Sequence, residues 1–246
     1  MSIETPEELA ALKAAGRVVA DAIKAMRAHA GPGVTTRELD EIGGRVLARV
    51  GARSGPQLDY GFPGICCISV NDEAVHGIPD NRRLRDGDLV KLDVTAELDG
   101  FYADACASVP VGRASRSTQK LAATSRKALN RAMGVARVGV PINRIGRAVE
   151  QTVTAQGYAV CTELMGHGIG RRIHEQPNIP NYDARGCDQR LTEGLVITIE
   201  PIIASGQGAV VEAGDGWTFK TRDGSWSAHS EHTIIITAGA PLILTA

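Results

Sequence analysis

One stretch of this chain is echoed 106 residues further on. The segment from Gly33 to Gly51 aligns without a gap onto the segment from Gly139 to Gly157, and both begin with Gly-Val. In each copy a long helical pattern precedes the Gly-Val pair, a shorter one follows it, and strand patterns come next. Two amphipathic helix pairs can also match by chance. A true repeat predicts one domain over residues 1–246, built from related halves of about 1–112 and 113–246.

The long helical pattern of the first copy has a recognisable start. Thr5 stands directly before Pro6 and three residues before Glu8, an arrangement typical of a helix N-cap. We therefore expect a helix from about residue 6 to about residue 30. Its counterpart in the second copy is expected from about residue 117 to about residue 137.

Two strand patterns meet at the dipeptide Asp99-Gly100. Residues 89–96 and 101–109 are rich in apolar and β-branched side chains, and Asp-Gly between such runs predicts a two-residue hairpin turn. That turn places Thr95 opposite Asp104 and Asp93 opposite Cys106, so both aspartates project from one face. Their Cα atoms would lie roughly 7 to 8 Å apart, within reach of a pair of metal ions. A three-residue turn would put them on opposite faces, and solvated strand carboxylates are the alternative interpretation.

Three further metal-type ligands follow along the chain. His167 lies within Gly-His-Gly-Ile-Gly, where glycines permit close backbone approach around a side chain that must be placed accurately. Glu200 ends an apolar run that a proline closes, and Glu231 opens a β-rich run near the C-terminus. Carboxylates at the ends of apolar strands are costly to bury unless they are paired or metal-bound. Four carboxylates and one imidazole favour a pair of divalent ions (Mn, Co, Fe or Zn) over a closed structural zinc site.

The composition narrows the class of protein. With 246 residues, 43% of them hydrophobic, and a formal net charge of -1, the chain can bury a full core and lacks the basic excess of a nucleic-acid binder. No apolar run approaches the roughly 18 residues of a membrane-spanning helix. The N-terminus is acidic where a secretory signal is basic. We expect a cytoplasmic protein with no membrane partner and no nucleic-acid substrate. The five cysteines fit neither a disulfide framework nor a zinc ribbon.

The spacing of residues excludes two other functional motifs. His174-Glu175 begins like the HExxH zinc-protease motif, but Asn178 stands where the second histidine must be. The glycines around His167 lack the GxGxxG spacing of a dinucleotide site, so no nucleotide cofactor is expected. No role is assigned to the remaining histidines, because a lone histidine is more often a surface or packing residue: His29, His229 and His232.

Five segments of the chain, in order and in spacing, closely resemble those of the type I methionine aminopeptidases. They are Asn71–Pro79, Leu92–Val94 followed by Asp104, Gly166–Gly170 followed by His174, Thr198–Pro201, and Glu231–Thr233. The resemblance covers essentially the whole chain. It implies the pita-bread fold, an α+β arrangement in which a curved antiparallel sheet is backed by helices in two pseudo-symmetric halves. The lack of a large insertion after His174 resembles type I, and the start of the chain resembles the short form without a zinc-finger extension.

The resemblance also implies roles for the five metal-type ligands. Asp104 and Glu231 would bridge two divalent ions, Asp93 would chelate one of them, and His167 with Glu200 would complete the other. Glu200 would also be the catalytic proton shuttle.

Two histidines outside the ligand set complete the implied catalytic residues. His76 and His174 would form hydrogen bonds with the scissile amide and with the oxyanion of the tetrahedral intermediate. They are therefore predicted to be both catalytic and substrate-binding.

The resemblance places a methionine pocket at Tyr60, Phe62, Cys67 and Trp217. Aromatic rings and sulfur suit a thioether, although core packing is the ordinary fate of Phe and Cys. Two positions depart from the family. Asp59 stands where a tyrosine is common, and Ile173 replaces the usual aromatic residue before His174. Both changes could widen the rim of the pocket or alter its polarity.

Together these features predict a dimetal methionyl aminopeptidase that removes the N-terminal methionine from nascent proteins and peptides whose second residue is small. We expect a monomer whose partners are nascent N-termini and the ribosome. One alternative is an Xaa-Pro peptidase of the same fold, although those usually carry a large N-terminal domain and further histidines near the ligands. Another is a catalytically silent relative that only binds peptides or ribosomes. Such relatives lose ligands, and here all five are present.

Overall fold

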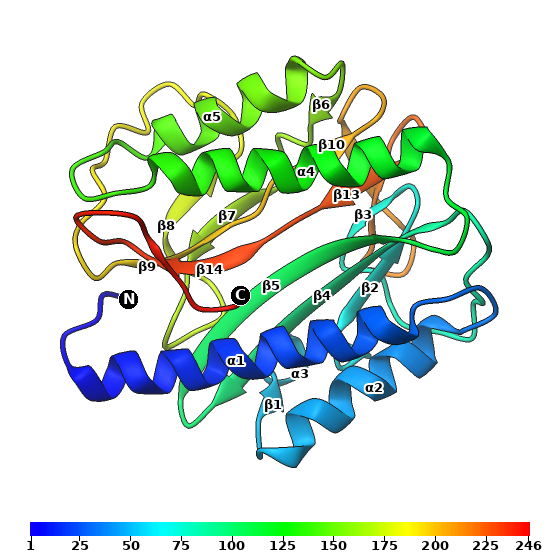
Figure 1. Ribbon diagram of the computed structural model, residues 1–246, viewed down its shortest axis with the longest axis horizontal. Coiled ribbons are helices and arrows are strands. Elements are labelled where there is room, and N and C mark those ends of the chain that lie inside the picture. Colours follow the sequence, from blue (N-terminus) through cyan, green and yellow to red (C-terminus); the bar gives the residue numbers. More distant parts are fainter.

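The computed structural model of the protein describes residues 1–246. Figure 1 shows two helix pairs, with α2 beside α1 and α5 beside α4, and the strands β5 and β14 running between α1 and α4. None of the helices combines the length and the apolar character that crossing a membrane requires. The helices are α1 (Pro6–His29), α2 (Thr36–Arg49), α3 (Gly55–Tyr60), α4 (Arg116–Val135) and α5 (Asn143–Thr154).

The strands form four small sheets in which all pairings are antiparallel. The first sheet has the order β1-β4-β2, with β5 paired to β4, and a five-stranded sheet has the order β15-β14-β9-β7-β8. Two three-stranded sheets have the orders β13-β10-β6 and β11-β12-β3. Helices backing antiparallel strands confirm the α+β class.

The bounds of the strands follow chain order. Those of the first half are β1 (Arg53–Ser54), β2 (Cys67–Val70), β3 (Glu73–Val75), β4 (Leu89–Leu98) and β5 (Phe101–Pro110). Those of the second half are β6 (Ala159–Val160), β7 (Met165–Gly168), β8 (Glu175–Pro180), β9 (Val196–Ile199), β10 (Ile202–Ala204), β11 (Val210–Glu212), β12 (Phe219–Thr221), β13 (Ser227–His229), β14 (His232–Ile235) and β15 (Leu242–Ile243).

The two long helices agree with the sequence at their starts and differ slightly at their ends. The Thr5 hydroxyl accepts a hydrogen bond from the backbone N–H of Glu8 at 3.2 Å, so the predicted N-cap is confirmed. Helix α4 ends two residues before the predicted position. There the Arg137 guanidinium donates to the carbonyl of Gly134 at 2.7 Å, which satisfies the last turn instead of extending it.

The predicted hairpin is present with its two-residue turn. Asp99 has φ 51° and Gly100 has φ 84°, the left-handed conformations that a type I′ turn requires at both positions. Strands β4 and β5 pair from Leu98↔Phe101 to Leu89↔Pro110, with Thr95 opposite Asp104 and Asp93 opposite Cys106. The predicted register is therefore confirmed.

The echo in the sequence corresponds to a repeated structure. Gly33 and its counterpart Gly139 both have positive φ (91° and 80°), and so do Gly51 and Gly157 (74° and 79°). Their surroundings match as well, because Gly33 donates to the carbonyl of Leu84 and Gly139 donates to that of Leu191, at 2.7 and 2.9 Å. The same turn with the same backbone contact thus occurs once in each half.

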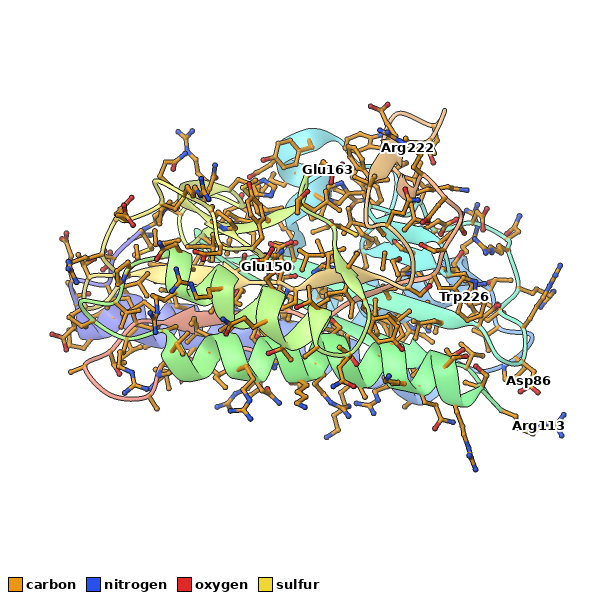
Figure 2. The ribbon with its side chains drawn as sticks, turned by 90° about the horizontal axis from the view of Figure 1, so that it is seen from above. Asp86, Arg113, Glu150, Glu163, Arg222 and Trp226 are labelled. Carbon is orange, nitrogen blue, oxygen red and sulfur yellow. The ribbon has the colours of Figure 1, made fainter.

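Each half has its own hydrophobic core. One cluster of 20 buried residues lies entirely within residues 15–111, and another of 22 lies between residues 121 and 236 except for Leu89. In Figure 2 the helix α4 lies on one side of the strands, whereas the segments carrying Glu163 and Arg222 lie on the other. These two cores pack the helix pairs against the strands.

Candidate active site

The hairpin β4–β5 carries the first two candidate ligands on the face away from α1 and α2. Leu92 and Val94 belong to the core cluster that includes residues of α1 and α2. Because side chains alternate along a strand, Asp93 projects to the opposite side, and Asp104 does so from β5. The hydroxyl of Thr95, directly opposite Asp104, donates to its Oδ2 at 2.8 Å and fixes the carboxylate.

His167 lies on β7 at a point where the chain packs very closely. A Cβ on Gly168 would lie 2.2 Å from the carbonyl oxygen of Gln176, so only glycine fits there. The register of β7 against β8 shifts between His167 and Gly168, a bulge that re-aims the imidazole. The backbone N–H of His167 donates to the hydroxyl of Thr198 at 3.0 Å, and its Nδ1 lies 2.9 Å from the carbonyl oxygen of Gly168. Its Nε2 is the nitrogen left free for a metal ion.

Glu200 and Glu231 lie at the same end of neighbouring strands. Glu200 directly follows β9 and Glu231 directly precedes β14, and these strands pair antiparallel from Ile199↔His232 onward. Thr198 donates its hydroxyl to Oε1 of Glu200 at 3.0 Å. Glu231 donates its backbone N–H to the carbonyl of Cys106 at 2.9 Å. This last bond attaches the second-half strand to the first-half hairpin.

A second link between the halves passes through Thr233. Its hydroxyl donates to the carbonyl oxygen of Asp104 at 2.7 Å and accepts from the backbone N–H of the same residue at 2.9 Å. Strands β5 and β14 are therefore held side by side at the level of the ligands, as Figure 1 also shows.

All five candidate ligands line one cavity of about 100 Å³. The cavity lies on the face of the β4–β5 hairpin away from α1 and α2, because Asp93 and Asp104 both line it. Asp104, His167, Glu200 and Glu231 expose at most 8% of their surface, whereas Asp93 is half-buried. The remaining residues around the cavity include three more histidines: His76, His174 and His229.

Burial dominates the electrostatics of these carboxylates. It raises the pKa of Asp104 to about 6 and raises the pKa of Glu200 and of Glu231 well above the usual range, with the charge of Asp104 as the next cause for both glutamates. Burial, then the charge of Asp104, also raises the pKa of Asp93. Four carboxylates around so small a space repel one another unless protons or cations neutralise them.

The donor set fits divalent cations. Oδ1 of Asp104 and Oε1 of Glu231 are buried without any hydrogen-bond partner. One ligand atom each from Asp104, His167 and Glu231 lies within 4.8 Å of the others. Burial lowers the pKa of His167 to about 3, so its imidazole is neutral and able to coordinate at ordinary pH. Orphaned oxygens beside a neutral imidazole are what a cation would satisfy.

The two predicted catalytic histidines both line this cavity. His76 follows β3 and has φ 56°, an unusual conformation for a residue with a side chain. Burial lowers its pKa to about 4, so it is neutral. His174 precedes β8, and its ring lies edge-on to that of His167 with centroids 4.2 Å apart. Each half of the molecule supplies one of these histidines.

The predicted pocket residues Tyr60, Phe62, Cys67 and Trp217 line a second cavity of about 260 Å³. Phe62 and Trp217 meet edge to face with centroids 5.3 Å apart. This apolar cavity adjoins the first, because four residues line both: His76, Asp93, Asp104 and His174. An apolar side chain bound there would place its backbone beside the carboxylates.

The two departures from the family pattern affect this pocket differently. Ile173 lines the cavity, so an aliphatic side chain replaces an aromatic wall. Asp59 lies outside the lining, because its carboxylate accepts from the hydroxyl of Tyr102 at 2.8 Å and from the backbone N–H of Ile173 at 3.4 Å. The Asp59 carboxylate is therefore not itself a lining group, although its charge acts on the lining residues Tyr60 and His174.

Sequence reasoning missed His229. This side chain is 2% exposed, lines the metal-type cavity, and has its Nε2 3.5 Å from Oε2 of Glu231 and 3.8 Å from Oε2 of Glu200. The available signal was its position two residues before Glu231, since alternate residues of an extended chain share a face. The same rule identifies Thr198, two residues before Glu200.

Lys91, two residues before Asp93, was also missed. It is 1% exposed, and its Nζ donates to the carbonyl of Asn71 at 2.8 Å and to the hydroxyl of Ser227 at 3.2 Å. Burial lowers its pKa to about 7. The lysine ties the turn that leads to His76 to strand β13, so its role is to join the two halves behind the site.

Comparison with known proteins gives consistent matches. The model of metallopeptidase family M24 matches residues 10–238. The chain is 45% identical to methionine aminopeptidase 2 of Bacillus subtilis, covering 100% of this chain and 99% of that protein. It is 38% identical to the methionine aminopeptidase of Escherichia coli K12, covering 100% and 94%. The crystal structure of methionine aminopeptidase from Rickettsia prowazekii superposes with a TM-score of 0.95 at 35% identity, covering all of both chains, which confirms the predicted pita-bread fold.

Proposed function

Because the chain belongs to the methionine aminopeptidases of metallopeptidase family M24, we propose that it removes N-terminal methionine with two divalent ions and prefers a small second residue. Family membership itself implies an aminopeptidase with a divalent metal cofactor. The number of ions, their ligands and the preference at the second residue are our proposal. The observation that carries it is the convergence of five ligands from both halves in one cavity that opens into an apolar pocket.

Five residues would hold the ions: Asp93, Asp104, His167, Glu200 and Glu231. Carboxylates outnumber the imidazole, so Mn, Fe, Co and Zn all suit the set. When bound, such ions polarise a carbonyl and lower the pKa of water so that a nucleophile exists near neutral pH. The two unpartnered oxygens, on Asp104 and Glu231, belong to the two residues that we assign as bridges.

Glu200 is the residue that we assign to proton transfer. Its Oε1 is engaged by the hydroxyl of Thr198, which leaves Oε2 to face the cavity. We infer that Oε2 takes a proton from the attacking water and passes it to the amine that leaves. A positioned general base of this kind contributes typically 10² to 10⁴ in rate.

His76 and His174 would orient the peptide and stabilise charge on it. Both rings are neutral at pH 7, because burial lowers the pKa of each, so each can donate one N–H. They face the cavity at its junction with the apolar pocket, where the first peptide bond would lie. We assign His76 to the scissile amide and His174 to the oxyanion, the kind of interaction that usually contributes most.

The pocket supports methionine at the first position. Phe62, Cys67 and Trp217 offer aromatic and sulfur contacts that a flexible thioether fills well. Tyr60 stands at the mouth and is 50% exposed. Nascent polypeptide N-termini are the proposed substrates. The monomeric state, ribosome association and cytoplasmic location stay predictions from the sequence.

The test is cleavage of Met-Gly-Met-Met by purified protein loaded in turn with Mn²⁺, Co²⁺, Fe²⁺ and Zn²⁺. We expect release of free methionine from this peptide, and none from acetyl-Met-Gly, which lacks the free amine. Met-Leu peptides should be cleaved much more slowly, and an Ala-Pro peptide should not be cleaved. Failure with every free Met peptide and every metal would overturn the proposal, and preference for Ala-Pro would favour the Xaa-Pro alternative.

A further inference from the structure

Tyr60 forms a contact that its place in the methionine pocket does not explain. Its hydroxyl lies 2.6 Å from Nδ1 of His174, and the two rings are tilted at 43° with centroids 5.6 Å apart. Half of the Tyr60 side chain is open to solvent. Because water could satisfy the Tyr60 hydroxyl, burial does not require the hydrogen bond to His174. The short distance therefore reflects how the two side chains are placed.

The neighbouring residue makes a parallel contact. Asp59 accepts from the backbone N–H of Ile173, so residues 59 and 60 at the end of α3 face residues 173 and 174 before β8. The hydroxyl of Tyr102 holds the Asp59 carboxylate at 2.8 Å. Helix α3 of the first half is thereby attached to the segment of the second half that carries His174.

The contact with Tyr60 determines which nitrogen of the His174 imidazole is available to a ligand. His174 has two ring nitrogens, and the Tyr60 hydroxyl occupies Nδ1. Only Nε2 is left for a ligand in the cavity that His174 lines. In a neutral imidazole one nitrogen donates and the other accepts. A group that stabilises a developing oxyanion must donate, so the proton would have to be on Nε2 and Nδ1 would have to accept.

A tyrosine hydroxyl suits that requirement and a carboxylate does not. A carboxylate beside Nδ1 accepts, so it draws the proton to Nδ1 and turns Nε2 into a base. A hydroxyl can donate to Nδ1 and leave the proton on Nε2. The acid in this segment, Asp59, is instead engaged with Tyr102 and the backbone of Ile173.

We propose that Tyr60 is a positioning residue for His174: it donates its O–H to Nδ1 and so keeps the Nε2–H form of the ring aimed into the cleft. This inference rests on the proposed function for the role of the donor, but the tautomer itself does not depend on activity. Asp59 also contributes to this positioning, because it fixes the backbone that carries the His174 ring.

The first measurement is the tautomer of His174. Protein labelled with ¹⁵N-histidine is examined by NMR at neutral pH, and the His174 signals are assigned by their loss in His174→Asn. We expect Nε2 to carry the proton in the native protein. In Tyr60→Phe we expect a mixture of both tautomers, with metal content unchanged. A native ring protonated on Nδ1 would overturn the proposal.

The second measurement separates positioning from pocket lining. In Tyr60→Phe, which keeps the ring, kcat on Met-Gly-Met-Met should fall about 10-fold while KM stays within about twofold, because a donor is misplaced and the pocket is intact. Tyr158→Phe is the matched control and should change neither, because Tyr158 lines neither cavity. A raised KM with unchanged kcat would make Tyr60 a pocket wall only.

A double-mutant cycle completes the test. Adding Tyr60→Phe to His174→Asn should lower kcat no further, since the hydroxyl then has no imidazole to orient. A further 10-fold loss would contradict the assignment. If no Met peptide is cleaved by the native protein, the proposed function fails, whereas the NMR result still decides the Tyr60 contact.

Discussion

The two halves of the molecule share a scaffold but supply their candidate ligands in different ways. Both contain a long and a short helix joined by a turn with a left-handed glycine, Gly33 in one and Gly139 in the other. The first half presents Asp93 and Asp104 from within one continuous hairpin. The second half presents His167, Glu200 and Glu231 from a bulge and two strand ends. Turn type and strand alternation position the two first-half ligands, whereas packing between distant segments positions the three second-half ligands.

This difference predicts which half of the site is more sensitive to substitution. A hairpin with ten paired positions and a favourable turn tolerates local change, because many hydrogen bonds maintain its register. The second set depends on close backbone approaches that leave no room for a side chain, such as that at Gly168. Substitutions in the second half should therefore reduce activity more than comparable substitutions in the first.

The largest effect is expected from Glu200, the second-half residue assigned to both metal binding and proton transfer. In Glu200→Ala we expect kcat on Met-Gly-Met-Met to fall by about 10³ or more. The exposed Glu193→Ala is the control and should retain native activity. Retained turnover in Glu200→Ala would remove this residue from the mechanism.

A smaller but still large effect is expected at Gly168. In Gly168→Ala the new Cβ would meet a backbone oxygen at 2.2 Å, so β7 and β8 must separate. We expect the free energy of unfolding, measured in urea, to fall by about 2 to 3 kcal/mol. Activity should fall with it as His167 moves. Gly134→Ala, in helix α4 with open space around it, should instead be neutral or stabilising by about 0.5 to 1 kcal/mol.

The matching change in the first half should matter less. Gly100→Ala puts a side chain at φ 84°, which costs about 1 to 2 kcal/mol, but nothing in the hairpin blocks the Cβ sterically. We therefore expect a loss of about 1 to 2 kcal/mol in urea unfolding with near-native kcat. Asp99→Asn, which tolerates the same conformation, is the control. A loss of activity as large as that of Gly168→Ala would contradict the distinction between the halves.

A pH-dependent effect is expected from His76, the first-half histidine. Burial lowers its folded pKa to about 4, whereas the unfolded value is about 6.5. The unfolded state therefore binds more protons between these values, and the stability that His76 contributes above pH 6.5 is lost as pH falls toward 4. The difference in unfolding free energy between metal-free native protein and His76→Asn should shrink over that range. A constant difference would show that His76 is not buried as a neutral ring.

The sequence alone predicted those features whose geometry depends on residues close together along the chain. The register of Asp93 and Asp104 follows from Asp99-Gly100 and strand parity, and the N-cap follows from Thr5 and Glu8. The alternation of side chains also placed His229 on the same face as Glu231. A single histidine, however, is more often a surface or packing residue. Local patterns and the family resemblance both identified the residues of the second half, but neither explained how these residues meet.

The remaining features depend on contacts between distant segments. The bond from Tyr60 to His174 spans 114 residues, and that from Lys91 to Ser227 spans 136. Neither has a local signature, since both depend on how the two halves pack. The engagement of Asp59 by Tyr102 could likewise not be foreseen, and it keeps the Asp59 carboxylate out of the pocket lining.

If ligands from both halves hold a pair of divalent ions, anomalous diffraction from crystals grown with Mn²⁺ will locate both ions. We expect two peaks roughly 3.5 to 4 Å apart, one beside Asp93 and the other beside His167, with Asp104 and Glu231 contacting both. A single peak, or peaks bound by residues of only one half, would contradict it.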